Sequence, residues 1–235
     1  MSRVPAPVQL AFSFRHTAAY RLEDFLPAPC NRAALDAILA WPDWPTPALV
    51  LHGPPGSGRT HLAHIWCDRA RALFMTGAEL WEVADPLERL GTARALVIDD
   101  ADLATAPRLL LELYNLLVER RGHLLLTATG PVEGWGLALP DLLSRLKAAA
   151  SARIAPPDDA LLAALLVKQF GDRGLSVPPA IVEYLIARME RSFAAAAQLV
   201  EALDRASLRA RRPVTMGLAR LALAEMAARE AEAEG

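Results

Sequence analysis

The stretch "LVLHGPPGSGRTHLAHIW", residues 49–66, decides the fold. It joins an apolar run to a helical segment through a loop that contains three glycines. A strand, a glycine-rich loop and a helix in this order present backbone N–H groups to phosphate at the positive end of the helix dipole. The spacing is that of a phosphate-binding loop, with arginine in place of the usual lysine. It predicts a nucleotide site formed by Gly53, Pro54, Pro55, Gly56, Ser57, Gly58, Arg59, Thr60 and His61.

A second motif, "ALVIDDAD" at residues 95–102, follows the loop by about 40 residues. Its apolar residues predict a strand that delivers two carboxylates to the edge of the sheet where α/β proteins bind ligands. We expect Thr60 and Asp99 to hold Mg²⁺, and Asp100 to orient or deprotonate an attacking water. Arg59 keeps the positive charge of the missing lysine, but it is forked and bulkier, so phosphate binding is better supported than catalysis.

Two further segments contain polar residues that are candidates for the nucleotide site or for catalysis. The run "HLLLTATG", residues 123–130, ends with Thr127 and Thr129 beside the expected γ-phosphate, although β-branched residues are equally ordinary in a strand. The run "LPDLLSRL", residues 139–146, places Arg145 on a helix just before the last strand. An arginine there is a candidate arginine finger for a neighbouring subunit's nucleotide. Because only two of the 25 basic residues are lysines, an ordinary surface arginine is the alternative.

The order of the elements predicts an α/β domain with a five-stranded parallel sheet, followed by a small all-helical lid. Strands are expected at 48–52, 73–76, 95–98, 123–128 and 152–155, and helices between them at 58–70, 106–121 and 139–147. A short helix at 31–40 precedes them. After Pro156 and Pro157 the strands stop, and helices are expected at 158–173, 178–189, 192–210 and from 214 onward. The predicted units are an arm at 1–22, the α/β domain at 23–157 and the lid at 158–235.

Composition narrows the class of protein. Of the 235 residues, 53% are hydrophobic and 22% are charged, which is typical of a folded globular chain. The net charge of −2 does not favour a dedicated nucleic-acid binder, but it leaves a local basic face open. Two cysteines without a signal-peptide pattern predict a reduced, cytoplasmic protein. No apolar run approaches the roughly 18 residues that a membrane span needs.

Together these motifs resemble the AAA+ family, and within it the DnaA-like replication initiators and the related Hda proteins. The resemblance covers nearly the whole chain and includes "GPPGSGRTHLAHIW", "ALVIDDAD", "LLLTAT", "LPDLLSRL" and, in the lid, "ALDRASLRARRPVT". It implies an AAA+ nucleotide-binding domain with a lid, ADP or ATP as ligand, and Mg²⁺. Hda proteins also carry arginine in the lysine position of the loop.

Three features favour the Hda proteins over the initiators. The sequence has no residues after the lid for the initiators' helix-turn-helix domain, and the segment 77–94 looks too short for the extra helices that initiators carry there. The third feature is "QLAFSF", residues 9–14, which is similar to the peptide by which Hda docks on the sliding clamp. In that comparison Gln9 makes polar contacts while Leu10, Phe12 and Phe14 fill an apolar groove. The alternative is an arm that packs on its own domain.

One position departs from the family pattern. An arginine on the third lid helix reaches the nucleotide in these families, whereas this sequence has Ala194 there and Arg191 one turn earlier. The resemblance implies a regulator that binds ADP or ATP, tethers to the clamp and presents Arg145 to ATP on DnaA. It implies no sequence-specific DNA binding and no membrane partner, and leaves homo-oligomers open. The alternatives are an autonomous AAA+ ATPase, such as a helicase or a clamp-loader-like remodeller, and a nucleotide-independent adaptor.

Overall fold

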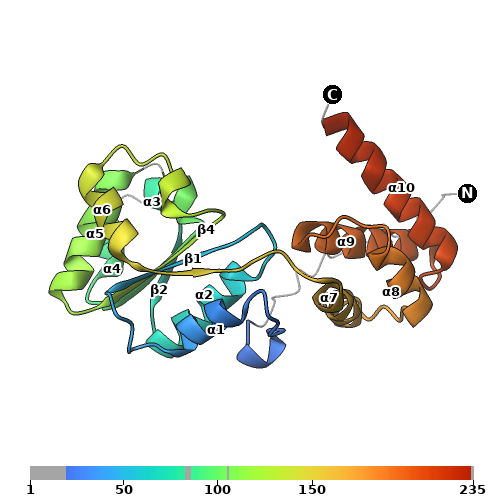
Figure 1. Cartoon of the computed structure of the whole chain (residues 1–235), viewed down its shortest axis with the longest axis horizontal. Helices are drawn as coiled ribbons and strands as arrows, with labels where there is room; N and C mark the ends of the chain where they lie inside the picture. Colours follow the sequence, from blue (N-terminus) through green and yellow to red (C-terminus); the bar gives the residue numbers. More distant parts are fainter. Residues whose placement is uncertain (1–19, 83–85, 105, 234–235) are drawn as a thin grey trace, which may run out of the picture.

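The computed structural model describes residues 20–82, 86–104 and 106–233. It shows an α/β domain and a helical lid that lie beside each other, with the chain crossing from one to the other after the last strand (Figure 1). Among the described residues, no helix combines the length and the apolar character needed to cross a bilayer.

The α/β domain is built on a five-stranded sheet in which every pair of neighbours is parallel. The strand order is β2-β3-β4-β1-β5, so that β1 lies between β4 and β5. The bounds are Ala48–His52 for β1, Leu73–Thr76 for β2, Ala95–Asp99 for β3, His123–Ala128 for β4 and Ala150–Arg153 for β5. Because all the strands are parallel, their carboxyl ends meet along one edge, and the loops that follow β1, β3 and β4 converge there.

The predicted position of the last strand was wrong by two residues. The sequence favoured 152–155, whereas β5 pairs with β1 from Ala150 opposite Leu49 to Arg153 opposite His52. Register against β1 sets these bounds, and beyond them the N–H of Ala155 donates to the carbonyl of Cys30 at 2.9 Å.

Helices cover both faces of the sheet, as the buried side chains show. On one face Leu49 and Leu51 pack with α1 (Arg32–Leu39) and α2 (Arg59–Ala70). On the other face Val50 packs with α5 (Pro107–Glu119) and α6 (Pro140–Ala148). Burial on both faces explains why the central strands read as continuous apolar runs. The segment 77–94 contains two short helices, α3 (Glu79–Glu82) and α4 (Pro86–Leu90), which the sequence did not lead us to expect.

The lid consists of four helices around its own apolar core. Their bounds are Asp159–Asp172 for α7, Pro179–Ile186 for α8, Phe193–Ala210 for α9 and Met216–Ala233 for α10. Two of them start with capping side chains, because Asp158 accepts from the N–H of Leu161 at 2.8 Å and Ser192 accepts from that of Ala195 at 3.0 Å. Such caps satisfy N–H groups that a helix start leaves without partners.

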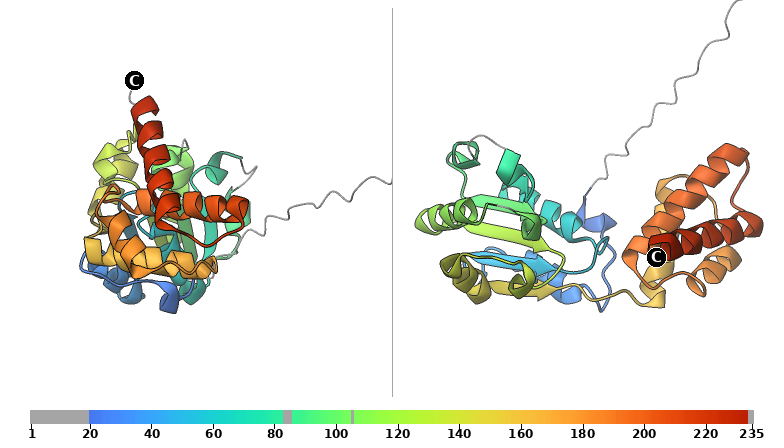
Figure 2. Two further views of the ribbon diagram at one scale, coloured as in Figure 1. Left: turned by 90° about the vertical axis from the view of Figure 1, so that its right-hand side faces the viewer. Right: turned by 90° about the horizontal axis from the view of Figure 1, so that it is seen from above.

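The lid is joined to the α/β domain by an apolar contact. Leu161 of α7 and Phe193 at the start of α9 are only 6% and 4% exposed, and both belong to the core cluster on the α1/α2 face of the sheet. Burying a side chain of this size stabilises by about 1.5–3 kcal/mol. The first turn of α9 is therefore held against the α/β domain, and Figure 2 shows the two units from further directions.

Candidate nucleotide-binding site

The phosphate-binding loop connects β1 to α2 in a shape that requires glycine. Gly56 and Gly58 have φ angles of +76° and +91°, in the left-handed region that disfavours side chains. Gly53 lies so close to the neighbouring strand that a Cβ would come within 2.8 Å of the Cβ of Ile154. The loop therefore wraps tightly at the start of α2, the arrangement predicted from the sequence.

Two buried polar atoms of this loop lack hydrogen-bond partners among the described residues: Ser57 Oγ and Arg59 Nη1. The N-cap of helix α2 is Gly58, which has no side chain to cap the first N–H groups of the helix. Buried donors without partners are costly, so their presence at a helix N-terminus fits a loop that is completed by an anion. These residues are therefore suited to hold the phosphates of a nucleotide.

The residues predicted to hold Mg²⁺ are brought together. The hydroxyl of Thr60 donates to Asp99 Oδ2 at 2.8 Å, across 39 residues of sequence. The other oxygen of Asp99 accepts from the hydroxyl of Thr127 at 2.6 Å. Asp99 and Thr127 are buried, with 5% and 0% exposure, so this network is rigidly placed. A hydroxyl beside a carboxylate suits Mg²⁺, which is held through few protein oxygens together with phosphate and water.

Arg59 contacts the carboxylate predicted to act on water. Its Nη2 lies 3.2 Å from Asp100 Oδ1, which leaves the unpartnered Nη1 free to donate elsewhere. Burial raises the pKa of Asp100, the nearby charge of Asp99 raises it further, and Arg59 opposes both. The ion pair engages Oδ1 of Asp100, so an interaction of this carboxylate with water would compete with Arg59 at that oxygen. Arg59, which occupies the usual lysine position of the loop, is thus paired with Asp100, the candidate general base.

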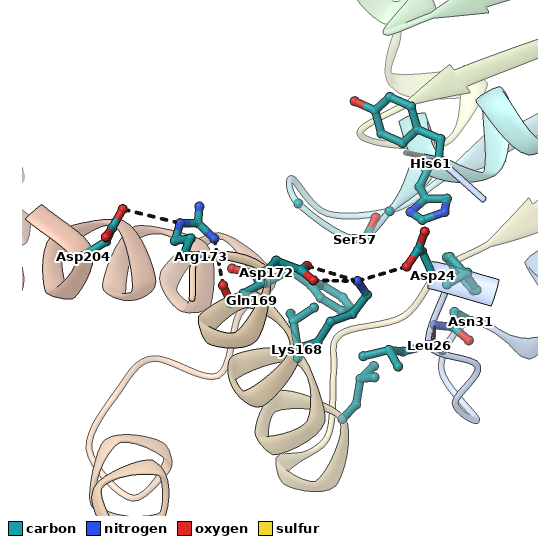
Figure 3. Close-up of a pocket in the computed structure, with 17 residues that line it drawn as sticks. Asp24, Leu26, Asn31, Ser57, His61, Lys168, Gln169, Asp172, Arg173 and Asp204 are labelled. Atoms are coloured by element: carbon teal, nitrogen blue, oxygen red, sulfur yellow. Dashed lines mark hydrogen bonds and ion pairs between the residues drawn. The ribbon is translucent and has the colours of Figure 1, made fainter. Parts of the chain in front are cut away.

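A cavity of about 780 Å³ opens beside the phosphate-binding loop, between the two domains (Figure 3). Its wall on the α/β side includes Gly56, Gly58, His61 and residues of the segment that leads into α1. Its wall on the lid side comes from α7 and α9. A nucleotide whose phosphates lie on the loop would extend into this space, which lies within the usual size of ligand sites.

A lysine that the sequence did not single out joins the two walls of the cavity. Lys168 of α7 lies 3.4 Å from Asp24 on the α/β side and 3.0 Å from Asp172 on its own helix (Figure 3). Burial lowers the pKa of Lys168, but its hydrogen bonds and ion pairs with Asp172 and Asp24 outweigh burial and raise it. Only its spacing from Asp172, four residues along a helix, was visible in the sequence.

The segment that precedes α1 is bound to the helix that follows the loop. The ring of Tyr20 stacks on His64 at 4.1 Å, and His64 stacks on Phe74 at 4.2 Å. One turn earlier, Nε2 of His61 lies 2.8 Å from the carbonyl oxygen of Arg21. Burial lowers the pKa of His64, which favours the neutral ring in this stack. His61 also lines the cavity, and its predicted contact with a nucleotide stays a prediction.

Comparisons with known proteins agree with this geometry. The family described as "Hda, lid domain" matches residues 158–223. Domain III of the replication initiation protein DnaA from Thermotoga maritima superposes with a TM-score of 0.73 at 18% identity, covering 88% of this chain and 96% of that one. The lid thus matches the lid domain of the Hda family, and the chain as a whole has the fold of DnaA domain III.

Two further structures have the same fold. AMPPCP-bound DnaA from Aquifex aeolicus gives a TM-score of 0.63 at 16% identity, covering 82% of this chain and 69% of that one. A point mutant of RuvB from Thermotoga maritima gives 0.66 at 17% identity, covering 86% and 70%. At these identities the structural matches establish the fold, and they confirm the predicted AAA+ architecture with its helical lid.

The two lid residues considered in the sequence as contacts of the nucleotide, Ala194 and Arg191, lie in different places. The backbone N of Ala194 is 3.3 Å from the position that a Cβ at Gly56 would take, so Ala194 does adjoin the loop. Arg191 instead forms a two-pronged ion pair with Asp159, at 2.7 and 3.2 Å. At this contact the lid therefore brings the backbone of Ala194 to the phosphate-binding loop, while the guanidinium of Arg191 is engaged by Asp159.

Thr129 and Arg145 are engaged outside the Asp99 network. The N–H and hydroxyl of Thr129 both donate to Asp102, so Thr127 is the β4 threonine that contacts Asp99. Nε of Arg145 donates to Asp141 one turn earlier at 3.1 Å, and its side chain is 39% exposed. Arg145 does not line the cavity, and Figure 1 shows its helix α6 on the side of the α/β domain away from the lid. Gln9, Leu10, Phe12 and Phe14 lie outside the described residues.

Proposed function

We propose that this protein is an Hda-like inactivator of the initiator DnaA. In this proposal it binds ADP or ATP with Mg²⁺, docks on the DNA-loaded sliding clamp through residues 9–14, and supplies Arg145 to ATP bound on DnaA. Hydrolysis there would leave the initiator inactive and prevent repeated initiation. The observation that carries the proposal is the location of Arg145, half-buried on α6 with 39% of its side chain exposed, and absent from the wall of the chain's own nucleotide cavity.

The chemistry asked of Arg145 is electrostatic. A guanidinium placed against the transferred phosphoryl group neutralises charge that develops in the transition state, and is worth roughly 10³–10⁵ in rate. In this structure the guanidinium is held by one i,i+4 ion pair to Asp141 and lies 5.7 Å from the centre of the Tyr114 ring. An exposed pair of this kind contributes only about 0.2–1 kcal/mol, so a partner's phosphate can replace it at little cost.

The chain's own site supports binding better than turnover. Its loop offers unpartnered buried donors, and its Thr60–Asp99 contact suits Mg²⁺. Arg59, however, is paired with Asp100, and Ala194 brings no cation to the loop from the lid. When bound, the metal ion would supply charge neutralisation for the phosphates. We therefore expect nucleotide to be held with slow hydrolysis.

The alternative is an autonomous AAA+ ATPase, favoured by the presence of Asp99, Asp100 and Thr60 at one sheet edge. For such an enzyme Asp100 would act on the chain's own ATP. Turnover by the purified protein separates the two functions, because the autonomous enzyme hydrolyses ATP without a partner and loses this activity on Asp100→Ala.

The test is the ATPase activity of DnaA in the presence of clamp-loaded DNA, with and without this protein. Stimulation should be lost in Arg145→Ala and also in Arg145→Lys, since an ammonium lacks the planar fork. Arg108→Ala, which removes another exposed arginine from the neighbouring helix α5, should stimulate like the parent. Equal stimulation by Arg145→Ala and the parent would show that Arg145 is no arginine finger.

Docking on the clamp is tested separately. Changing Leu10 and Phe12 to alanine should abolish binding to the clamp, because apolar anchors cost about 2 kcal/mol or more when truncated. The same variant should bind nucleotide like the parent. Unchanged clamp affinity would mean that the arm has a different role.

A further inference from the structure

Helix α9 connects the phosphate-binding loop to the opposite end of the lid. Its first residue, Phe193, adjoins Gly56, and its 18 residues span about 27 Å at 1.5 Å per residue. Figures 1 and 2 show the turn between α9 and α10 at the end of the lid that is remote from the α/β domain. This turn belongs neither to the nucleotide site nor to the face that carries Arg145.

The end of α9 and the turn that follows it carry more arginines than nearby acidic residues can pair with. Arg205, Arg209, Arg211 and Arg212 are all exposed. Arg205 pairs with Glu201 at 3.6 Å, and the other nearby acid, Asp204, faces Arg173 at 3.9 Å. Among the described residues, no ion pair or side-chain hydrogen bond engages the guanidinium groups of the remaining three arginines. We call Arg209, Arg211 and Arg212 the arginine turn.

The fold itself accounts for little of this charge. Arg209 lies in the last turn of α9, where the helix dipole favours a cation, but Arg211 and Arg212 come after the helix. Arg211 has a φ of +48°, a conformation for which glycine is the usual residue. The turn is closed by other groups, since the Ser207 hydroxyl donates to the carbonyl of Arg212 at 2.7 Å. The turn is thus held by contacts that do not involve the side chains of Arg209, Arg211 and Arg212.

We propose that the arginine turn binds the phosphates of duplex DNA without reading its sequence. The planar fork of arginine matches phosphate oxygens, and contacts of this kind position a protein on DNA but carry no base information. The choice of DNA over an acidic protein surface rests on the proposed function, which holds the chain beside DNA on a loaded clamp. Three charges give weak binding alone, but a clamp-tethered chain experiences DNA at high effective concentration.

The test measures fluorescence anisotropy of a short labelled duplex with the full chain alone, at salt concentrations between about 50 and 200 mM. Three phosphate contacts predict a slope of log K against log salt near −2.7, at about −0.9 per contact. Changing all three arginines to glutamine should weaken binding at the lowest salt by at least about tenfold and flatten the slope. The double change Arg209→Gln with Arg212→Gln leaves the left-handed residue intact and should act in the same direction.

A matched control removes the same charge elsewhere. Arg94, Arg108 and Arg121 are exposed on the α/β domain, and Arg121 is also left-handed, with φ +53°. Glutamine at these three positions should leave duplex binding and its salt slope unchanged. Equal loss in both triple variants, or no loss in either, overturns the proposal.

Lipid vesicles provide a further contrast, because Leu208 in the last turn of α9 is 69% exposed and offers an apolar side chain to a membrane surface. Binding to vesicles of anionic phospholipid without binding to the duplex also overturns the proposal. Neither clamp nor initiator is present in this assay. If Arg145 proved not to be an arginine finger, the result of the duplex-binding assay would be unaffected. Likewise, a failure to bind the duplex would leave the test of Arg145 unaffected.

Discussion

Gly56 is the position where the phosphate-binding loop meets the lid, and Gly56→Ala tests that contact. At φ +76° any side chain is disfavoured, by roughly 1–2 kcal/mol. The new Cβ would also lie 3.2 Å from the carbonyl carbon and the Cβ of Phe193, which is 4% exposed and part of the α/β core. Overpacking of a well-packed position costs about 1–3 kcal/mol. If the lid moved away to relieve this contact, Phe193 would lose its burial at a similar cost.

The two contributions together lower the free energy of unfolding by about 2–5 kcal/mol. In a chain of this size 1 kcal/mol corresponds to about 2–4 °C in Tm, so Tm should fall by about 4 °C or more. Gly136→Ala is the matched control, because Gly136 has φ +65° but a Cβ added there would meet no atom of the described residues within 4 Å. It should lose only the conformational part, about 1–2 kcal/mol.

The assay is thermal unfolding followed by tryptophan fluorescence, which reports on the α/β domain because all five tryptophans precede residue 136. The difference in Tm between Gly56→Ala and Gly136→Ala measures the cost of the contact with α9. Equal values for the two variants would refute the reasoning, since they would mean that the lid is not held against the loop.

Three more predictions concern the walls of the cavity and its ligand. Adenine nucleotide with Mg²⁺, at a hundredfold excess over its Kd, should stabilise the protein by about 2.7 kcal/mol, and no thermal shift with either ADP or ATP would contradict the assigned site. Lys168→Met removes the ion pair between the two walls of the cavity and should lower both Tm and the nucleotide-induced shift in Tm. Lys147→Met is the control, because it breaks only an exposed contact at 3.9 Å and should change neither quantity. Equal effects of the two variants would show that Lys168 does not link the walls. His64 has a pKa below its ordinary value of 6.5 because of burial, so the unfolded chain binds that proton more readily and stability falls as pH drops below about 6.5. His64→Phe should keep a ring in the stack and flatten the dependence of stability on pH between about 5 and 7. One proton changes the free energy of unfolding by at most about 1.36 kcal/mol per pH unit. An unchanged pH dependence of Tm would show that His64 does not contribute to it.

Local pattern determined most of the elements. The strands at 48–52, 73–76 and 123–128 have the predicted bounds, because each is a short apolar run closed by turn-forming or polar residues. The phosphate-binding loop is equally local, since the glycines that it needs are adjacent in the chain. The last strand, with the sequence ASAR, is less apolar than the others, so its bounds came from pairing with β1 and not from its own residues.

Only the tertiary structure decided which side chains meet. Lys168 and Asp24 are 144 residues apart, and nothing in their spacing indicates that they close one cavity. Thr127 and Thr129 look alike in the sequence, but they contact different carboxylates. The sequence left open whether Arg191 replaces the missing lid arginine, and the structure pairs Arg191 with Asp159. The physical reason is that a sequence pattern reports which face of an element is apolar, whereas a polar contact depends on distances within a few tenths of an ångström between elements that only packing brings together.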